Sequence, residues 1–181
     1  FRSFNLFGIR GDIQKCRLAL KHDYKYKLED DDILKILSIA EDHRVYVHFG
    51  IDQYAMVRAI YYTNVKKEFQ GASTIAQQLV RVITQRYEKN IVRKFREQLL
   101  AVLISKEYTW EEIASTYMNI AFLGSGMNGL DEYLVRKKLL ISKLTFEDKL
   151  QLISCLKYPE PIKNKEKWYF LIKKRMNSIQ V

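Results

Sequence analysis

The chain has 181 residues, 48% of them hydrophobic and 13% aromatic, and this length and composition favour a globular protein with an apolar core. No apolar run approaches the roughly 18 residues that a membrane-spanning helix needs, and the first residues lack the pattern of a signal peptide. The net charge of +10 indicates an anionic partner, such as nucleic acid, an acidic membrane surface or a phosphorylated substrate, with a solvated basic face as the alternative.

Two prolines and seven glycines leave little turn chemistry, which favours helices joined by a few loops. Residues 1–27 mix apolar and basic side chains without a sustained period, so an irregular or partly helical lead-in is expected there. Cys16 and Cys155 are too few and too far apart to indicate a metal site. The sequence shows no convincing strand pattern.

Glu41 is expected on the last turn of the first clear helix. Apolar residues recur at helical spacing from Ile33 to Ala40, and the acidic residues 30–32 can cap such a helix. The negative end of a helix dipole and nearby apolar packing both favour proton uptake by a carboxylate, so Glu41 is a candidate general base. The alternative is that residues 41–44 form only a solvated turn.

Asp52 can cap a second helix, predicted over residues 53–65. Tyrosines and apolar residues lie on more than one face of this helix, and Lys66 and Lys67 follow it. This composition is typical of an element at a membrane interface, although a helix buried on two sides has the same pattern.

A third helix is predicted over residues 74–87, with Ser73 as its N-cap. Thr74, Gln78 and Arg81 fall on one face of it, away from the apolar stripe. Free N–H groups at the helix start, two hydroxyl groups and a nearby cation together favour a phosphate site. The alternative is that Ser73 and Thr74 serve only as caps.

The next helix, predicted over residues 90–106, carries a cluster of cations around Glu97. A salt bridge between Glu97 and Arg93 alone is the simplest interpretation. The positive charge exceeds what one carboxylate neutralises, however, so we expect an additional anion to bind there and the pKa of Glu97 to be lowered. The cations are Arg81, Lys89, Arg93, Lys94 and Arg96.

Three more helices are predicted towards the end of the chain. Thr109 and Glu112 form a capping box that starts one over residues 110–119, and a glycine-rich loop follows it. Thr145 starts the next, which ends before Pro159, and residues 163–181 are expected to form a basic amphipathic helix.

Taken in order, these segments resemble the motifs of the peptidoglycan glycosyltransferase family, glycosyltransferase family 51. This is the transglycosylase module of penicillin-binding proteins and of monofunctional transglycosylases. The resemblance covers about residues 30–175, with a shortened fifth motif at 144–159. The matching segments are Glu-Asp-x-x-x-Tyr-x-His-x-Gly from Glu41, Gly-x-Ser-Thr-x-x-Gln-Gln from Gly71, Arg-Lys-x-x-Glu from Arg93 and Glu-Ile-x-x-x-Tyr-Met-Asn from Glu112.

The resemblance implies an all-α fold, a lysozyme-like lobe with a small membrane-facing jaw at about residues 53–70, within one domain spanning residues 1–181. It implies polymerisation of undecaprenyl-diphosphate-linked disaccharide-peptide into glycan strands, with release of undecaprenyl diphosphate. The expected location is the outer face of the cytoplasmic membrane, with an N-terminal anchor ahead of Phe1. Other cell-wall synthesis proteins are expected as partners.

By the same resemblance, Glu41 is the general base and Glu97 the second essential carboxylate of an inverting enzyme. Glu97 is also the candidate ligand for Mg²⁺ or Mn²⁺, with assistance by protein cations alone as the alternative. The implied substrate-binding residues are Asp42, His48, Ser73, Thr74, Gln77, Gln78, Arg81, Lys89, Arg93, Lys94, Arg96, Glu112 and Asn119.

The chemistry of these residues supports a transferase independently. A diphosphate is already a competent leaving group, so the site needs one base and a positive field. A glycoside hydrolase needs a protonated acid, and a carboxylate among cations is a poor proton donor.

Departures from the family pattern leave alternatives. Arg81 replaces a lysine, Trp110 a lysine and Ser115 a glutamate, so a different lipid-linked saccharide is one alternative substrate. A non-catalytic protein that binds lipid diphosphate is another. A nucleic-acid partner is not expected, because only the net charge favours it and no recognised motif is present.

Overall fold

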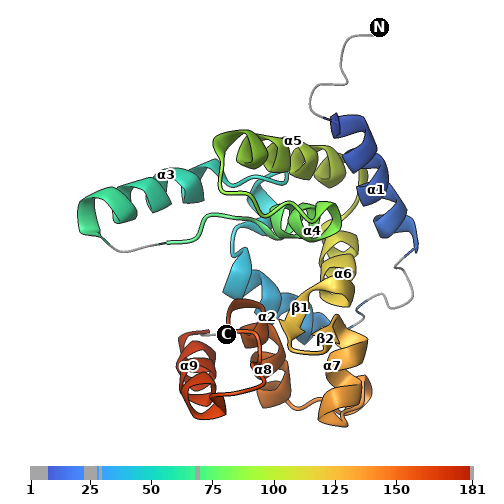
Figure 1. Cartoon of the computed structure of the whole chain (residues 1–181), viewed down its shortest axis with the longest axis vertical. Helices are drawn as coiled ribbons and strands as arrows, with labels where there is room; N and C mark the ends of the chain where they lie inside the picture. The colour runs from blue at the N-terminus through green and yellow to red at the C-terminus, as the bar shows by residue number, and fades with distance from the viewer. Residues whose placement is uncertain (1–7, 23–27, 29, 68–69, 180–181) are drawn as a thin grey trace, which may run out of the picture.

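The computed structural model describes residues 8–22, 28, 30–67 and 70–179, which are mostly helical (Figure 1). The prediction of an all-α fold is confirmed. The helices are α1 (Ile9–His22), α2 (Asp31–Glu41), α3 (Gln53–Tyr61), α4 (Ile75–Thr84), α5 (Ile91–Glu107), α6 (Trp110–Ile120), α7 (Leu130–Lys137), α8 (Phe146–Lys157) and α9 (Lys165–Ser178). The short elements are the 3₁₀ helices η3 (Val45–Val47) and η5 (Ile141–Lys143), the π-helical turn η4 (Tyr62–Lys66), and strands β1 (Phe122–Gly124) and β2 (Met127–Asn128).

Two segments are more regular than their sequence indicated. The lead-in, expected to be irregular or partly helical, contains the 14-residue helix α1, in which Ile13, Cys16 and Leu20 form a buried stripe that many basic neighbours mask in the sequence. The glycine-rich loop predicted after residue 119 contains an antiparallel β1–β2 hairpin, and α7, with buried Leu130 and Tyr133, follows it. The absence of strands was therefore a wrong prediction at this point.

The helices pack around one continuous cluster of buried apolar side chains. α4 lies against α1, α5 and α6, whereas α2 packs against α8, which in turn contacts α9. Figure 1 shows α1, α4 and α5 at one end of the molecule and α2, α8 and α9 towards the other. The end of α2 thereby meets the start of α4, where the motifs of the sequence come together.

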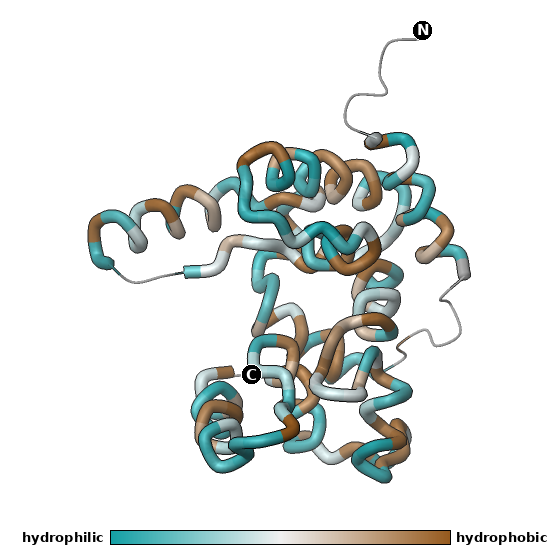
Figure 2. Tube along the Cα trace, viewed as in Figure 1, coloured by the Kyte–Doolittle hydropathy of each residue, from teal (hydrophilic) through white to brown (hydrophobic). Residues whose placement is uncertain are grey.

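α3 projects away from the other helices (Figure 1). Asp52 caps it as predicted, its Oδ1 accepting a hydrogen bond of 3.0 Å from the Ala55 N–H. Only the small Ala55 and Ala59 are buried on this helix, and Figure 2 shows hydrophobic residues recurring along it. None of the described helices is both long and apolar enough to cross a bilayer. Large exposed residues of α3 and η4 form what we call the apolar arm: Tyr54, Val57, Ile60, Tyr61 and Val65.

Candidate active site

Glu41 lies at the end of α2, where the sequence placed it, and two side chains from distant helices hold its carboxylate. The Gln78 amide of α4 donates to Glu41 Oε2 over 3.2 Å. Arg175 of α9 donates to Glu41 Oε1 over 3.1 Å and to the Ala40 carbonyl over 2.5 Å. The Glu41 side chain is 15% exposed, so it has access to solvent and is also oriented.

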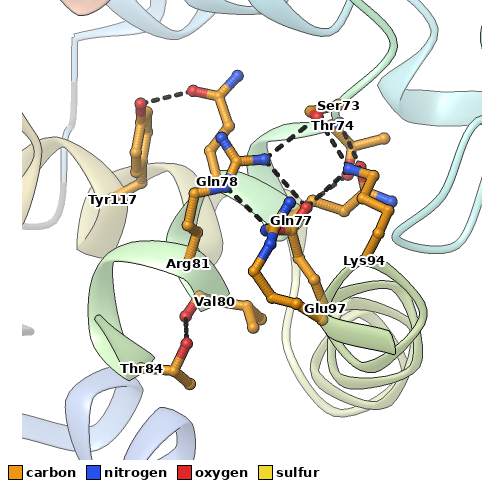
Figure 3. A network of polar contacts seen from close by, with 11 residues as sticks. Ser73, Thr74, Gln77, Gln78, Val80, Arg81, Thr84, Lys94, Glu97 and Tyr117 are labelled. Atoms are coloured by element: carbon orange, nitrogen blue, oxygen red, sulfur yellow. Dashed lines mark hydrogen bonds and ion pairs between the residues drawn. The ribbon is translucent and has the colours of Figure 1, made fainter. Parts of the chain in front are cut away.

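Tyr117 of α6 fixes the amide that contacts Glu41. Its hydroxyl donates to Gln78 Oε1 over 2.6 Å (Figure 3). The Gln78 amide nitrogen is thereby left to donate to Glu41. Burial, and then the charge of Glu41, raise the pKa of Tyr117 well above its usual value. The phenol therefore keeps its proton and acts as a donor at neutral pH.

Asp42, at the end of α2, is buried, and its carboxylate contacts the start of α4. Its Oδ1 contacts His48 Nε2 at 2.7 Å, and its Oδ2 accepts from the Ile75 N–H over 3.1 Å. Asp42 and the His48 side chain are both more than nine-tenths buried. Because Asp42 directly follows Glu41 in the chain, its hydrogen bond to the start of α4 also fixes the position of Glu41 relative to that helix.

Thr74, and not Ser73, is the N-cap of α4. The Thr74 hydroxyl accepts from the Gln77 N–H and donates to the Gly50 carbonyl over 2.6 Å, while Gln77 Oε1 accepts from the Thr74 N–H. The N–H groups of Thr74, Ile75 and Gln77 therefore have partners within the protein, and the phosphate site expected at this helix start remains a prediction that does not use these three groups. Ser73 does not cap the helix, and its hydroxyl contacts Arg81 and Lys94 instead.

Arg81, Arg93 and Lys94 surround Glu97, and we call these three side chains the cation cluster. Figure 3 shows Arg81 and Lys94 directed towards Glu97. Arg81 binds both Glu97 oxygens at 2.9 and 3.0 Å, Arg93 binds one at 2.6 Å and Lys94 the other at 2.7 Å. The Ser73 hydroxyl accepts from Arg81 over 3.3 Å and from Lys94 over 3.0 Å. Three cations around one carboxylate leave a net positive charge that suits an anion.

The ionisation of Glu97 follows from these contacts. Burial raises the pKa of Glu97, but hydrogen bonds from Arg81 and Lys94 outweigh burial and hold that pKa below its usual range, as predicted. Glu97 is 3% exposed and stays charged at neutral pH. It cannot serve as a proton-donating acid there.

One pocket holds both Glu41 and Ser73, and Ser73 contacts two residues of the cation cluster. Glu41, Ser73 and Arg58 of α3 line a pocket of about 130 Å³. Gln78, which binds Glu41, and Arg81, which binds Glu97, lie one turn apart on α4. Ser73 contacts the cation cluster and also lines the Glu41 pocket, so base and cations share one side of α4.

Two predicted cations lie elsewhere. The Arg96 guanidinium forms an ion pair with Asp12 of α1, and both residues are buried. The prediction that Arg96 joins the cation cluster is therefore wrong, because its face of α5 packs on α1, in a segment that was expected to be irregular or partly helical. Lys89 is exposed between α4 and α5, and its side chain forms no hydrogen bond or ion pair within the described part of the chain.

Glu112 and Asn119 lie at the two ends of α6. Glu112 accepts from the Thr109 N–H over 2.6 Å in the predicted capping box. At the other end, the Asn119 carbonyl lies against Gly129, where a Cβ would approach its oxygen to 1.9 Å. Both positions support the frame of the helix that carries Tyr117.

The surroundings of Glu97 do not fit a resident divalent cation. Both Glu97 oxygens are already taken by nitrogen donors, and no group of three His, Cys, Asp or Glu side chains in the described ranges could hold a metal. A second protein carboxylate, which Mg²⁺ sites commonly use, is not found at this position in those ranges. No step below involves a metal.

Arg175 and Tyr117 are the site residues that the sequence did not indicate. Tyr117 stood in the fourth motif but was interpreted only as a helix residue, and Arg175 was one of several basic residues in the last helix. No local pattern distinguishes either from its neighbours. Their partners, Gln78 and Glu41, lie 39 and 134 residues away in the chain.

Comparison with known proteins gives the same family. The family model described as Transglycosylase matches residues 20–180. A monofunctional glycosyltransferase of Staphylococcus saprophyticus is 36% identical over 130 residues, which are 71% of this chain and 46% of that protein. Penicillin-binding protein 1A of Aquifex aeolicus is 35% identical over 102 residues, 56% of this chain and 14% of that protein, so the chain spans less than half the length of these relatives. The chain belongs to the peptidoglycan transglycosylase family, whose motifs its sequence resembles.

Proposed function

We propose that this protein is a peptidoglycan glycosyltransferase that polymerises undecaprenyl-diphosphate-linked disaccharide-peptide and releases undecaprenyl diphosphate. The observation that carries the proposal is the placement of Glu41 and the cation cluster along the same side of α4. Family membership supports the reaction class. The proposed location is the outer face of the cytoplasmic membrane, with other cell-wall synthesis proteins as partners.

Glu41 is the general base in this proposal. It takes the proton from an acceptor sugar hydroxyl while that oxygen forms a bond to the anomeric carbon of the donor. The bond between this carbon and the diphosphate oxygen breaks, and its electron pair leaves with the diphosphate. Attack from the face opposite the leaving group inverts the configuration. Gln78 and Arg175 orient the carboxylate for this role.

The cation cluster receives the negative charge that develops on the leaving diphosphate. Arg81 and Lys94 also contact Ser73, so their donors lie at the edge of the Glu41 pocket. Glu97 holds the three cations in place and lowers the cost of bringing them together. Fixed cations at a developing charge need no reorganisation during the reaction, which is why they accelerate it.

The apolar arm supports a lipid-bound substrate. Its tyrosines and aliphatic side chains are more than half exposed, and Lys66 follows directly. Aromatic and aliphatic residues with adjacent cations favour the interface of an anionic membrane. In this proposal the arm, which falls within the residues 53–70 expected to form the jaw, lies on the membrane and brings the site to the diphosphate of the substrate.

A reconstituted polymerisation assay tests the proposal. The protein, in vesicles or detergent, is supplied with labelled lipid-linked disaccharide-peptide, and polymer and released undecaprenyl diphosphate are measured together. We expect both products from the unaltered chain and neither from Arg81→Ala. If a monofunctional relative makes polymer under the same conditions and this protein yields neither product, the proposed activity is wrong.

A further inference from the structure

α9 has a buried face and an exposed face of different character. Trp168 and Ile172 are buried, and the Trp168 Nε1–H donates to the Tyr158 carbonyl at the end of α8 over 2.8 Å. On a helix of 3.6 residues per turn, Phe170 lies opposite these two buried side chains. It is 70% exposed, so the face of α9 that is turned away from α8 presents a large apolar side chain to water.

Lysines surround Phe170 on this exposed face. Lys167 lies three residues before it, and Lys173 and Lys174 lie three and four residues after it. All three are exposed, and none forms an ion pair within the described ranges. Glu166 is the only acid in α9, so the face keeps a net positive charge. We call Phe170 and these three lysines the α9 patch.

The α9 patch belongs to the most basic part of the chain. Residues 136–181 contain 12 Lys and Arg and 4 Asp and Glu, a net charge of +8 that is most of the chain's +10. The positive charge is therefore concentrated in the part of the sequence that ends α7 and forms α8 and α9. Such a concentration of charge favours an anionic partner at this part of the molecule.

The apolar residues decide which anionic partner fits best. Beside Phe170, Tyr169 is 54% exposed, and Ile162 just before the helix is 74% exposed. A soluble polyanion can pair with the lysines, but it leaves these side chains in water. At the surface of an anionic bilayer the lysines meet phosphate headgroups, while aromatic and aliphatic side chains enter the boundary of the acyl chains. The combination therefore favours a lipid surface.

The position of α9 relative to the site agrees with a lipid surface. Ala55 and Arg58 of α3 line the Glu41 pocket, and Arg175 of α9 holds the Glu41 carboxylate. In Figure 1, α3 and α9 both extend towards the left side of the molecule. One bilayer can therefore touch α3 and α9 together, with the pocket between these two contacts.

We propose that the α9 patch is a second membrane contact, in which Phe170 enters the bilayer interface and the three lysines bind anionic headgroups. The inference rests on the proposed function and deepens it, because the same bilayer holds the apolar arm and the lipid-bound substrate. The helix also carries Arg175, so this contact sets the height of Glu41 above the bilayer.

A tryptophan placed at position 170 tests whether this residue enters the interface. Phe170→Trp is mixed with phosphatidylglycerol vesicles whose acyl chains are brominated, and quenching of tryptophan fluorescence is measured. We expect stronger quenching than in the unaltered chain, whose Trp110 and Trp168 give the background. Leu18→Trp is the matched control, because Leu18 is 52% exposed on α1, and it is expected to add no quenching.

A charge variant tests the lysines. The lysine variant replaces Lys167, Lys173 and Lys174 by glutamine, and its binding to phosphatidylglycerol vesicles is measured by sedimentation. Binding should weaken by about 10- to 100-fold at low salt, the effect of losing three cations at an anionic surface. The matched control replaces three exposed cations of α1, Arg10, Lys15 and Lys21, by glutamine. It has the same net charge and should change binding by less than about twofold.

The outcomes separate this inference from its alternatives. If Val57→Trp in the apolar arm is quenched and Phe170→Trp adds no quenching, the second contact is wrong and the contact of the arm is kept. If the lysine variant loses binding to polyphosphate as much as to vesicles, again without quenching at position 170, the patch binds a soluble polyanion, which also overturns the inference.

The proposed function is tested separately in a neutral detergent without anionic lipid. There the lysine variant should polymerise the lipid-linked precursor as fast as the unaltered chain, because no bilayer surface is present. A loss of rate in detergent means that the lysines act on the substrate, which overturns the inference. If neither chain makes polymer in detergent, the proposed function is wrong, whatever the fluorescence of Phe170→Trp shows.

Discussion

Replacing Glu41 by glutamine removes the proposed base with little change in shape. The new amide oxygen can still accept the hydrogen bond from Gln78, now at 3.2 Å. The ion pair with Arg175 is lost, and both side chains are more than four-fifths buried. A partly buried pair of this kind contributes about 1–2 kcal/mol, so the variant is expected to stay folded.

The expected loss of rate is much larger than the loss of stability. General base catalysis contributes about 10²- to 10⁴-fold, which corresponds to about 3–5 kcal/mol of transition-state free energy. Glu41→Gln should therefore slow turnover at least about 100-fold. Binding of a prenyl diphosphate should be nearly unchanged, because the cation cluster is intact.

The assay measures released undecaprenyl diphosphate at saturating substrate, alongside thermal denaturation of each variant. Asp31→Asn is the matched control, because it removes an exposed carboxylate from the first turn of the same helix. Turnover in Glu41→Gln within about twofold of the unaltered chain would refute the assignment of the base. The same loss in Asp31→Asn would refute the argument from position.

Three other predictions concern stability. Glu97→Gln leaves three cations without their carboxylate and should lower the free energy of unfolding at pH 7 by about 3 kcal/mol in urea. Since folding lowers the pKa of Glu97, its stabilising effect is present above about pH 4.5 and is lost at lower pH, so the two proteins should converge in acid. Arg175→Gln frees the Glu41 carboxylate and should cost about 1–3 kcal/mol, seen as a lower melting temperature together with slower turnover. Gly129→Ala, at a φ of +88° and with a Cβ 1.9 Å from a backbone oxygen of α6, should cost about 3 kcal/mol or more, whereas Gly11→Ala in α1, with no atom nearby, should stabilise by about 0.5–1 kcal/mol.

Interactions within one helix were largely predictable. Glu97 meets Arg93 and Lys94 because residues three and four apart on a helix are neighbours, and the hydrogen bond from Lys94 adds to that from Arg81 of α4 in lowering the pKa of Glu97. The capping box at Thr109 and the cap at Asp52 were predicted for the same reason, since both depend on contacts within four residues.

Interactions at the junction of helices were predicted less well. Both Ser73 and Thr74 are suitable N-caps, and only the position of the Gly50 carbonyl decides for Thr74. Arg96 was grouped with the other cations of its helix, but α1 brings Asp12 to its face of α5. A sequence that hides the apolar stripe of α1 among basic residues hides this partner as well.

The amino-acid sequence by itself determined the helical fold, the order of the motifs and the two carboxylates of the site, because helical period, capping and motif spacing are local properties of the chain. Only the tertiary structure decided that Arg175 reaches Glu41 and that Tyr117 orients Gln78. Those contacts depend on how α9 and α6 are placed relative to α2 and α4. That placement results from the packing of many buried side chains, and no short segment of the sequence contains it.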